Sequence, residues 1–260
     1  MKRLSMFLTL ACGASLGQQA VNTPSGLFRP APYFGRQPFF NKVVTGQPFS
    51  AEFVNENVQT LADGSHVTQD DAAIRVYRDS FGRMREECSK YPHMAGARSA
   101  SQAAMMVHII DPVARVRYVV DTEKKVTHRQ ALLTGAEAKA GVEQPYVKPP
   151  AQPPERKAPE TSVEKLEPQT IEGVQAEGRR ATTTWPPGSR IGNEAALTGV
   201  VETWESRELQ VILLVKTTDP RAGEQTEKLT NLSRMEPDPM LFQPPAEYTI
   251  VDEKEETIIK

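Results

Sequence analysis

Short segments in which apolar and polar residues alternate, divided by turn residues, make up most of the chain. The alternation is clear over residues 49–61 (FSAEFVNENVQTL), and it returns over residues 103–130 and 171–235. A period of two is typical of β-strands with one face buried, and short spacings between such runs favour hairpins. We therefore expect about ten strands arranged as an antiparallel meander.

Turn residues place individual hairpins. Residues 79–82 (DSFG) divide two alternating runs, and Gly82 suits the left-handed position of a bulged hairpin loop. Residues 219–223 (DPRAG) mark a second turn. Residues 211–215 are apolar at every position, which predicts a strand covered on both faces. Helical periodicity is scarce, and residues 129–140 are the best candidate for a short helix.

The first twenty residues, MKRLSMFLTLACGASLGQQA, have the pattern of a secretory signal peptide. Basic residues 2–3 precede an apolar run over residues 4–16, and polar residues begin at Gln18. The run is too short for a permanent transmembrane helix. Cys12 raises the alternative of a lipid anchor, but it lies inside the apolar run rather than at its end. We expect cleavage of residues 1–20 and export to the periplasm or the extracellular space.

Composition divides the rest of the chain into a body and three irregular segments. Residues 21–48 mix Pro and Gly with aromatic residues and keep no period, so we expect an extended N-terminal arm. Residues 141–169 are expected to form a proline-rich, charged linker, because each Pro removes a backbone donor. A single β domain over residues 49–251 would surround this linker, and residues 252–260 would form a charged tail.

Charge and cysteine content exclude several classes of function. The net charge is −2, which gives no overall attraction to nucleic acid or to acidic lipid. After the signal, no stretch approaches the length of a membrane span. Cleavage would leave Cys88 as the single cysteine, so no internal disulfide framework is expected. Cys88 would then be either a packed apolar residue or a point of pairing with a second protein.

Candidate chemistry is sparse. The sequence has no GxSxG elbow, no SxxK motif, no glycine-rich phosphate loop and no dinucleotide fingerprint. We therefore expect no enzyme activity and no cofactor, and we expect acidic pairs such as residues 86–87 to be solvated. One set of soft side chains resembles a copper(I) ligand set: Cys88, His93, Met94, Met105, Met106 and His108. Ordinary core packing explains the same residues, and we expect no metal.

Five stretches carry a resemblance to known families: YRDSFGRMREE, IIDPVARVRYVVD, IEGVQAEGRRATTTWPPGSRIGNE, TWESRELQVILLVKTTDPRAGEQTEKLTNL and EPDPMLFQPPAEYTI. Over about residues 45–251 they resemble a family of exported proteins common in acidobacterial genomes. At the level of the fold, the order of strands is similar to periplasmic lipoprotein-carrier (LolA-like) and sigma-factor-regulator (RseB-like) proteins. This resemblance implies a mainly β protein in which a strongly curved antiparallel sheet, an open half-barrel with few short helices, surrounds an apolar hollow.

The resemblance implies a non-catalytic binding protein of the cell envelope that holds an apolar, acyl or lipoprotein-like ligand. The candidate ligand-facing residues on the sheet are Ile74, Val76, Val119, Val211, Leu213 and Val215. Leu241 and Phe242 are expected to form a one-turn plug against the sheet, and residues 248–251 a closing strand at its edge.

Two alternatives stay open. The same apolar residues would also suit a dry core without a ligand. The protein would also fit a structural or signalling module that binds an envelope protein through a sheet edge or the proline-rich segment. A hydrolase without a recognisable motif is a third, weaker hypothesis.

Overall fold

The computed structural model describes residues 43–61, 63–70, 73–89, 105–134, 157–189, 191–253 and 257–259. The expected signal peptide, residues 21–42 of the arm and residues 141–156 of the linker lie outside these ranges. Within them the strands are β1 (Phe49–Thr60), β2 (His66–Asp70), β3 (Ile74–Arg78), β4 (Met84–Ser89), β5 (Met105–Asp111), β6 (Val116–Asp121), β7 (Val126–Thr134), β8 (Glu160–Ile171), β9 (Val174–Trp185), β10 (Leu197–Ser206), β11 (Val211–Asp219), β12 (Gly223–Ser233), β13 (Thr249–Asp252) and β14 (Thr257–Ile259).

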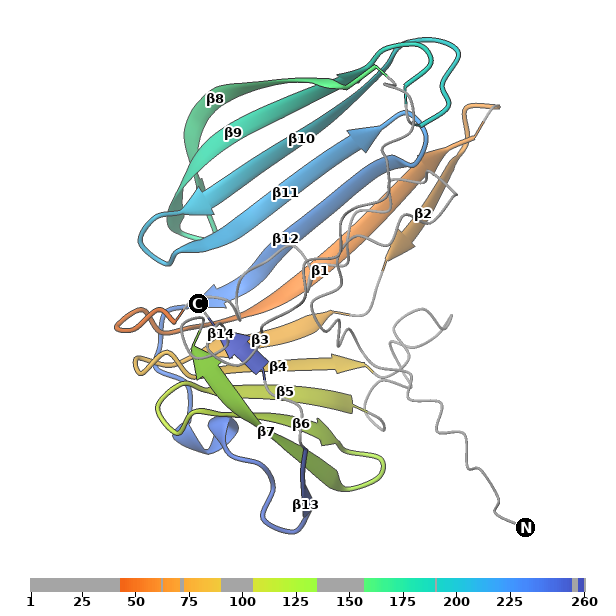
Figure 1. Ribbon diagram of the computed structural model, residues 1–260. Coiled ribbons are helices and arrows are strands. Elements are labelled where there is room, and N and C mark those ends of the chain that lie inside the picture. Colours follow the sequence, from red (N-terminus) through yellow and green to blue (C-terminus); the bar gives the residue numbers. More distant parts are fainter. Residues whose placement is uncertain are drawn as a thin grey trace, which may run out of the picture.

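All of these strands belong to one sheet, which bends strongly and does not close (Figure 1). Its order is β13-β7-β6-β5-β4-β3-β1-β12-β11-β10-β9-β8, and among the described residues the two end strands pair with no common partner. The first half of β1 pairs with β3 and its second half pairs with β2, so the sheet divides at this strand. The predicted fold class, a mainly β protein with an open, curved antiparallel sheet, is confirmed.

The predicted hairpin between β3 and β4 is present. Asp79 Oδ1 accepts hydrogen bonds from the backbone N–H groups of Phe81 (3.0 Å) and Arg83 (2.8 Å), which fixes the turn. Gly82 has a φ of +79°, and a Cβ there would lie 2.9 Å from Val43 Cγ1. Glycine is required at this position both by the left-handed backbone and by the close approach of the chain before β1.

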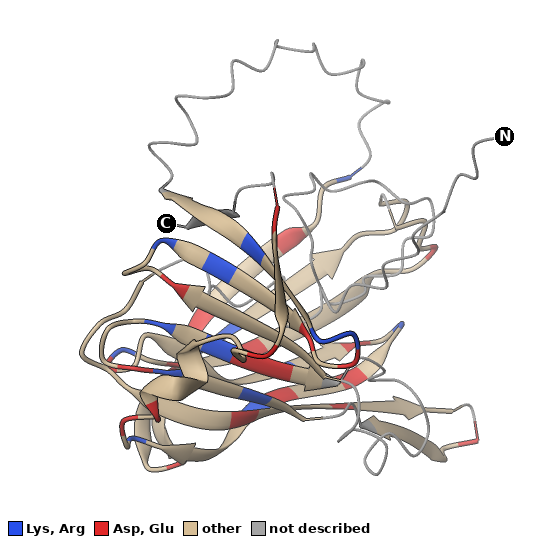
Figure 2. Cartoon of the chain, turned by 90° about the horizontal axis from the view of Figure 1, so that it is seen from below, with Lys and Arg blue, Asp and Glu red and all other residues tan. Residues whose placement is uncertain are grey.

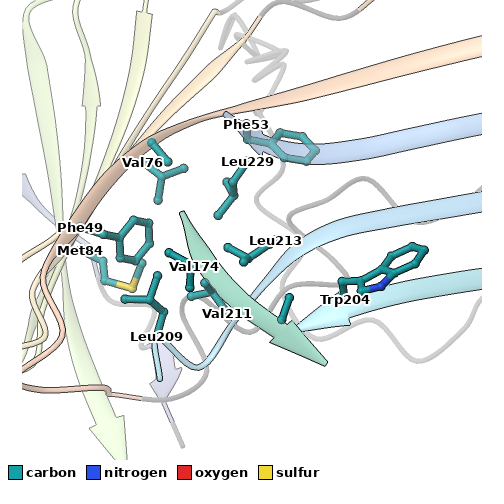
Figure 3. Packing of buried hydrophobic residues seen from close by; sticks show 12 residues of the cluster. Phe49, Phe53, Val76, Met84, Val174, Trp204, Leu209, Val211, Leu213 and Leu229 are labelled. Carbon is teal, nitrogen blue, oxygen red and sulfur yellow. The ribbon is translucent and has the colours of Figure 1, made fainter. Parts of the chain in front are cut away.

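The larger core lies inside the bend of the sheet. Its buried side chains come from β1, β3 and β4 on one side and from β9 to β12, with the β10–β11 turn, on the other, and they converge in the bend (Figure 3). Phe49, Val76 and Leu209 are fully buried there, and Leu213 and Leu229 are 1% exposed. The sheet therefore packs against itself by folding over, so that two distant parts of one layer form the core.

The lower half of the sheet comprises β3–β7 and β13 (Figure 1). A smaller core lies on the face of this half that is opposite to the larger core. Pro239–Phe242 forms a single 3₁₀ turn, and the Phe242 side chain, 1% exposed, packs in a cluster with Val107, Ile109 and Val120. Leu241 and Tyr248 pack against the same cluster. The EPDPMLFQPP segment thus packs against the sheet, on the face opposite Val76.

Three sequence-based expectations are corrected. Residues 129–134 of the expected helix belong to β7, where Leu132 is 2% exposed and the strand pairs with β6. Residues 160–169 of the expected linker belong to β8, which lies at the sheet edge; Pro168 sits where the β8–β9 register shifts, so its missing N–H leaves the ladder intact. Residues 257–259 of the charged tail form β14, which pairs in parallel with β7.

The closing strand expected at the sheet edge is present, but it runs parallel to its neighbour rather than antiparallel as expected. β13 pairs in parallel with β7, with Ile250 opposite Thr127. Strand direction does not follow from the alternation of residues, which is why the sequence indicates a strand here but not its sense. The strand expected over residues 211–215 alternates between buried and half-buried positions, so it is covered more completely on one face than on the other.

Charged side chains of both signs are interspersed along the strands and turns (Figure 2). On the upper half of the sheet, which comprises β8–β12, Arg180 forms ion pairs with Glu164 on β8 at 2.7 Å and with Glu202 on β10 at 2.6 Å. This pattern agrees with the small net charge of −2. Among the described residues, no helix has the length and apolar character needed to cross a membrane.

Candidate ligand-binding face

The strand register places one row of side chains across five strands of the lower half. Val76 on β3 lies opposite Glu86 on β4, which is followed by His108 on β5, Val119 on β6 and His128 on β7. Because side chains alternate along a strand, all five lie on one face of the sheet. We call it the inner face, because Val76 packs in the core inside the bend.

The six predicted ligand-facing residues separate into two groups. Val76, Val211 and Leu213 are buried in the core inside the bend, and Ile74 packs against it. For these four residues the dry-core alternative describes what the structure shows. Val215 is 7% exposed and lies outside that cluster, and Val119 is half-buried on the inner face three strands from Val76.

The inner face continues past this core onto β5, β6 and β7. Among the described residues, the cluster inside the bend includes no side chain from these three strands. Ile110 and Leu132 form a small separate cluster on the same face, and Val119 lies one row away. The inner face of β5–β7 therefore lies beyond the packed core, and it mixes apolar Met106, Ile110, Val119, Val126 and Leu132 with polar His108, Arg117, Asp121, His128 and Gln130.

Three of the polar side chains on the inner face come from the neighbouring strands β4, β5 and β6. Glu86 is 1% exposed and His108 is 5% exposed, and they are directly opposed in the β4–β5 register. Arg117 Nη2 donates a hydrogen bond to His108 Nδ1 at 3.0 Å. Glu86 Oε2 and His108 Nε2 are buried without a hydrogen-bond partner. Buried polar atoms are nearly always paired, so two unpaired atoms on directly opposed residues mark this place as unusual.

Burial shifts the pKa values of both groups toward their neutral forms. Desolvation, together with the smaller effect of the positive charge of Arg117, lowers the pKa of His108 to about 3. Desolvation also raises the pKa of Glu86 well above its usual value, and the attraction of Arg117 only partly opposes this. The imidazole is therefore neutral at physiological pH, and the carboxyl is biased toward its protonated form.

His108 should make the protein less stable in acid. Its folded pKa lies below the value of 6.5 for an exposed histidine, so the unfolded chain binds the extra proton first. Stability attributable to the neutral imidazole is complete above about pH 6.5 and is lost as the pH falls toward 3. Urea unfolding at pH 7 and pH 4 should show a clearly smaller acid loss for His108→Gln than for the wild type. Equal losses in both proteins would contradict the buried neutral imidazole.

Glu86 is a residue that the sequence interpretation missed, since acidic residues 86–87 were expected to be solvated. That expectation is wrong for Glu86, because strand β4 turns it toward the same face as Met84 and Cys88. The signal was available, since alternation with two buried neighbours two residues away predicts an inward-facing carboxyl.

The candidate copper ligands are partly brought together. Cys88 and Met106 lie opposite each other in the β4–β5 register, and His108 follows on the same face. His93 and Met94 lie outside the described residues. Within the described ranges, no three His, Cys, Asp or Glu side chains converge as a metal site would need. Cys88 is 2% exposed and is disulfide-bonded rather than a free thiol, so the expectation of no internal disulfide is wrong and its sulfur is not a thiolate ligand.

A surface pocket of about 350 Å³ lies on the upper half, over β9 to β12. Eight of its nine lining residues are polar or charged, among them Arg180, Glu202 and Lys216, and none of the six predicted ligand-facing residues lines it. Arg180 is already paired with two glutamates. This pocket lies on β9–β12, away from the inner face of β5–β7.

No family model matches the chain, and no curated protein matches it in sequence. Solved structures match it at low identity. A crystal structure of MucB is 16% identical, with a TM-score of 0.34, over 82% of this chain and 62% of that one. An uncharacterised protein from Thermus thermophilus is 8% identical, with a TM-score of 0.39, over 80% of this chain and 91% of that one. The lipoprotein LppX of Mycobacterium tuberculosis is 11% identical, with a TM-score of 0.28, over 73% of this chain and 88% of that one.

The chain spans less than two thirds of the matched MucB chain. All three TM-scores are below 0.5, which is too low for any of these proteins to indicate the function of this chain.

Proposed function

We propose that this protein is an exported, non-catalytic binding protein of the cell envelope that holds an apolar, acyl-type ligand against the inner face of β4–β7. The observation that supports this most strongly is the extent of the inner face. It continues beyond the packed core, and there apolar Ile110, Val119 and Leu132 lie beside two buried polar atoms without partners. A core built for stability alone has no need of such atoms.

The shape of the sheet supports the same proposal. A wide antiparallel sheet must close, pair with a second sheet or curl around something. Here the upper half folds over β1, β3 and β4, while β5–β7 contribute nothing to that core among the described residues. An acyl chain along β5–β7 would gain about 25 cal/mol for each Å² of apolar surface removed from water. In this proposal the aromatic arm of residues 21–48 covers the ligand.

Export of the protein from the cytoplasm is part of the proposal. Residues 1–20 have the pattern of a signal peptide, which would deliver the protein to the periplasm or beyond. A lipid or lipoprotein of the envelope is then the expected ligand class. N-terminal sequencing of the protein purified from cells should find the mature chain starting near Gln18 or Val21; a bulk product that retains Met1 would contradict export.

Binding of apolar probes tests the proposal directly. We expect the protein without residues 1–17 to bind an environment-sensitive apolar dye, and lauric acid to displace that dye. A second form without residues 18–45 should bind the dye more weakly or release it faster, because the proposed cover is missing. If neither form binds dye or laurate while both remain folded by circular dichroism, the ligand-carrier proposal fails.

A second candidate function rests on β8. This strand is twelve residues long, lies at the end of the sheet path, and exposes every side chain over Glu160–Lys165. An exposed edge of this length could accept a strand from an envelope protein. Its charges and Pro168 are also what proteins use to prevent edge pairing. Two results together would favour this function instead. The protein would bind neither dye nor laurate, and it would capture one defined envelope protein that the Val163→Lys variant no longer captures.

A further inference from the structure

We propose that Glu86 and His108 form the polar end of the ligand site and bind the oxygen atoms at the end of an acyl chain. The group recognised is a carboxyl or an ester carbonyl, whether from a free fatty acid or from an acylated lipid. This inference rests on the function proposed above and adds the chemical group that the site selects.

The position of the two residues supports a subsite within the inner face. Glu86 and His108 face each other across the β4–β5 pair, where opposed Cβ atoms lie about 4.5–5.5 Å apart. Apolar Val76 and Val119 flank them in the same cross-strand row. Val76 belongs to the packed core, so a ligand along this row would place its chain on Val119 and its polar end at the carboxyl and the imidazole.

The hydrogen-bonding state of His108 follows from its partner. A guanidinium can only donate, so His108 Nδ1 must accept from Arg117 Nη2. In a neutral imidazole the other nitrogen then carries the proton. His108 Nε2–H is therefore a buried donor without an acceptor.

Glu86 supplies a second donor when its carboxyl is protonated. Burial raises its pKa well above the usual value, which favours the protonated form, and Oε2 has no partner. Two adjacent donors suit a group that offers lone pairs and no protons, and the oxygens of a carboxylate or an ester carbonyl have this character. A primary amide or an alcohol would bring an N–H or O–H that finds no equally suitable acceptor beside His108 Nε2–H.

A site kept for binding should lower the stability of the ligand-free protein. Each unpaired buried group is costly, and apolar replacement of such groups is often neutral or stabilising. We therefore expect Glu86→Leu/His108→Leu to unfold at an equal or higher urea concentration than the wild type at pH 7. The matched control is Thr127→Val, since Thr127 Oγ1 is also buried and unpaired but lies opposite Val120, on the other face.

The experiment compares lauric acid, methyl laurate and an environment-sensitive apolar dye on the three full-length mature proteins. We expect the wild type and Thr127→Val to bind all three probes. Glu86→Leu/His108→Leu should keep its dye affinity and lose about tenfold or more in affinity for both acyl probes, since a hydrogen bond to a charged or polar end group is worth about that factor. Loss for lauric acid alone identifies the free acid as the ligand class; equal loss for the methyl ester extends it to acylated lipids.

Two results would overturn the inference. Unchanged laurate affinity in the double variant, with dye binding intact, would show that the polar pair is not a subsite, while the apolar ligand site would stand. Equal loss in Thr127→Val would show a general effect of removing buried polar groups. If the wild-type protein binds neither dye nor laurate, the result contradicts the proposed function itself, and not only the role of the polar pair.

Discussion

Truncating Phe242 to alanine should lower the free energy of unfolding by about 3–5 kcal/mol, as for other large side chains removed from a packed core. Phe242 is 1% exposed and fills the space over Val107, Ile109 and Val120. The guanidinium of Arg83 lies 5.0 Å from the centre of its ring, so the ring is also covered by a cation.

The surrounding turn holds Phe242 in place, which limits how far the cavity can relax. Arg85 Nη1 donates to the Leu241 carbonyl at 2.8 Å, and Asp238 Oδ1 accepts from the Met240 N–H at 2.9 Å. Glu236 accepts from the Ser80 N–H at 2.9 Å and anchors the start of the segment.

Urea unfolding followed by circular dichroism measures the effect. Met240→Ala is the matched control, because Met240 lies in the same turn but is 66% exposed, and its truncation should change stability by about 0.5 kcal/mol or less. A Phe242→Ala protein as stable as the Met240→Ala protein would mean that the turn does not contribute to the core.

Replacing Arg78 by alanine should have an effect of similar size, about 3–5 kcal/mol, from a cavity and from lost hydrogen bonds together. Arg78 is 2% exposed. Its Nη2 donates to the Leu209 carbonyl at 2.7 Å and its Nε donates to the Gln47 carbonyl at 2.9 Å. The guanidinium also lies 4.7 Å from the centre of the Phe49 ring.

These contacts join segments that are far apart in the chain. Arg78 ends β3, whereas Leu209 lies in the β10–β11 turn, so the side chain connects the two sides of the bend. Burial, with repulsion from Arg234, lowers the pKa of Arg78 to about 10. The side chain stays charged in both the folded and the unfolded chain at neutral pH, so its contribution should not vary with pH below about 10.

Arg75→Ala is the control for Arg78, because Arg75 lies on the same strand with its side chain 59% exposed and makes one ion pair with Glu87. Its loss should change the free energy of unfolding by about 0.2–1 kcal/mol. Arg78→Lys should fall between the two, since an ammonium cannot reach both carbonyls with the fixed geometry of a guanidinium. Equal urea midpoints of unfolding for Arg78→Ala and Arg75→Ala would contradict the role of Arg78 in connecting the two sides of the bend.

Local features of the fold could be predicted from the sequence because local chemistry determines them. Gly82 and Asp79 fix the β3–β4 hairpin, and both act within the turn itself. The alternation of residues predicts strands for most of the sheet. Phe242 could be expected to pack because it is a large apolar residue held between prolines in an otherwise polar segment.

Features that depend on contacts between distant segments could not be predicted in this way. The contact of Arg78 with Leu209 joins residues 131 positions apart. The parallel pairing of β13 and β14 with β7 depends on how the chain returns after β12, which alternation does not encode. For the candidate site, alternation indicated that Val76 shares a face with Ile74, but the row of Glu86, His108 and Val119 required the strand order.

The central claim is that an acyl ligand lies on the inner face of β4–β7, and two pairs of neighbouring residues make it testable. Ile110 and Val119 lie on the inner face. Their neighbours Ile109 and Val120 point to the opposite face, where they pack with Phe242. The measurement is the set of nuclear Overhauser contacts between bound laurate and the isoleucine and valine methyl groups of the mature protein. We expect contacts from the laurate methylene protons to Ile110 and Val119. Contacts to Ile109 and Val120 instead, or to none of the four, would contradict the claim.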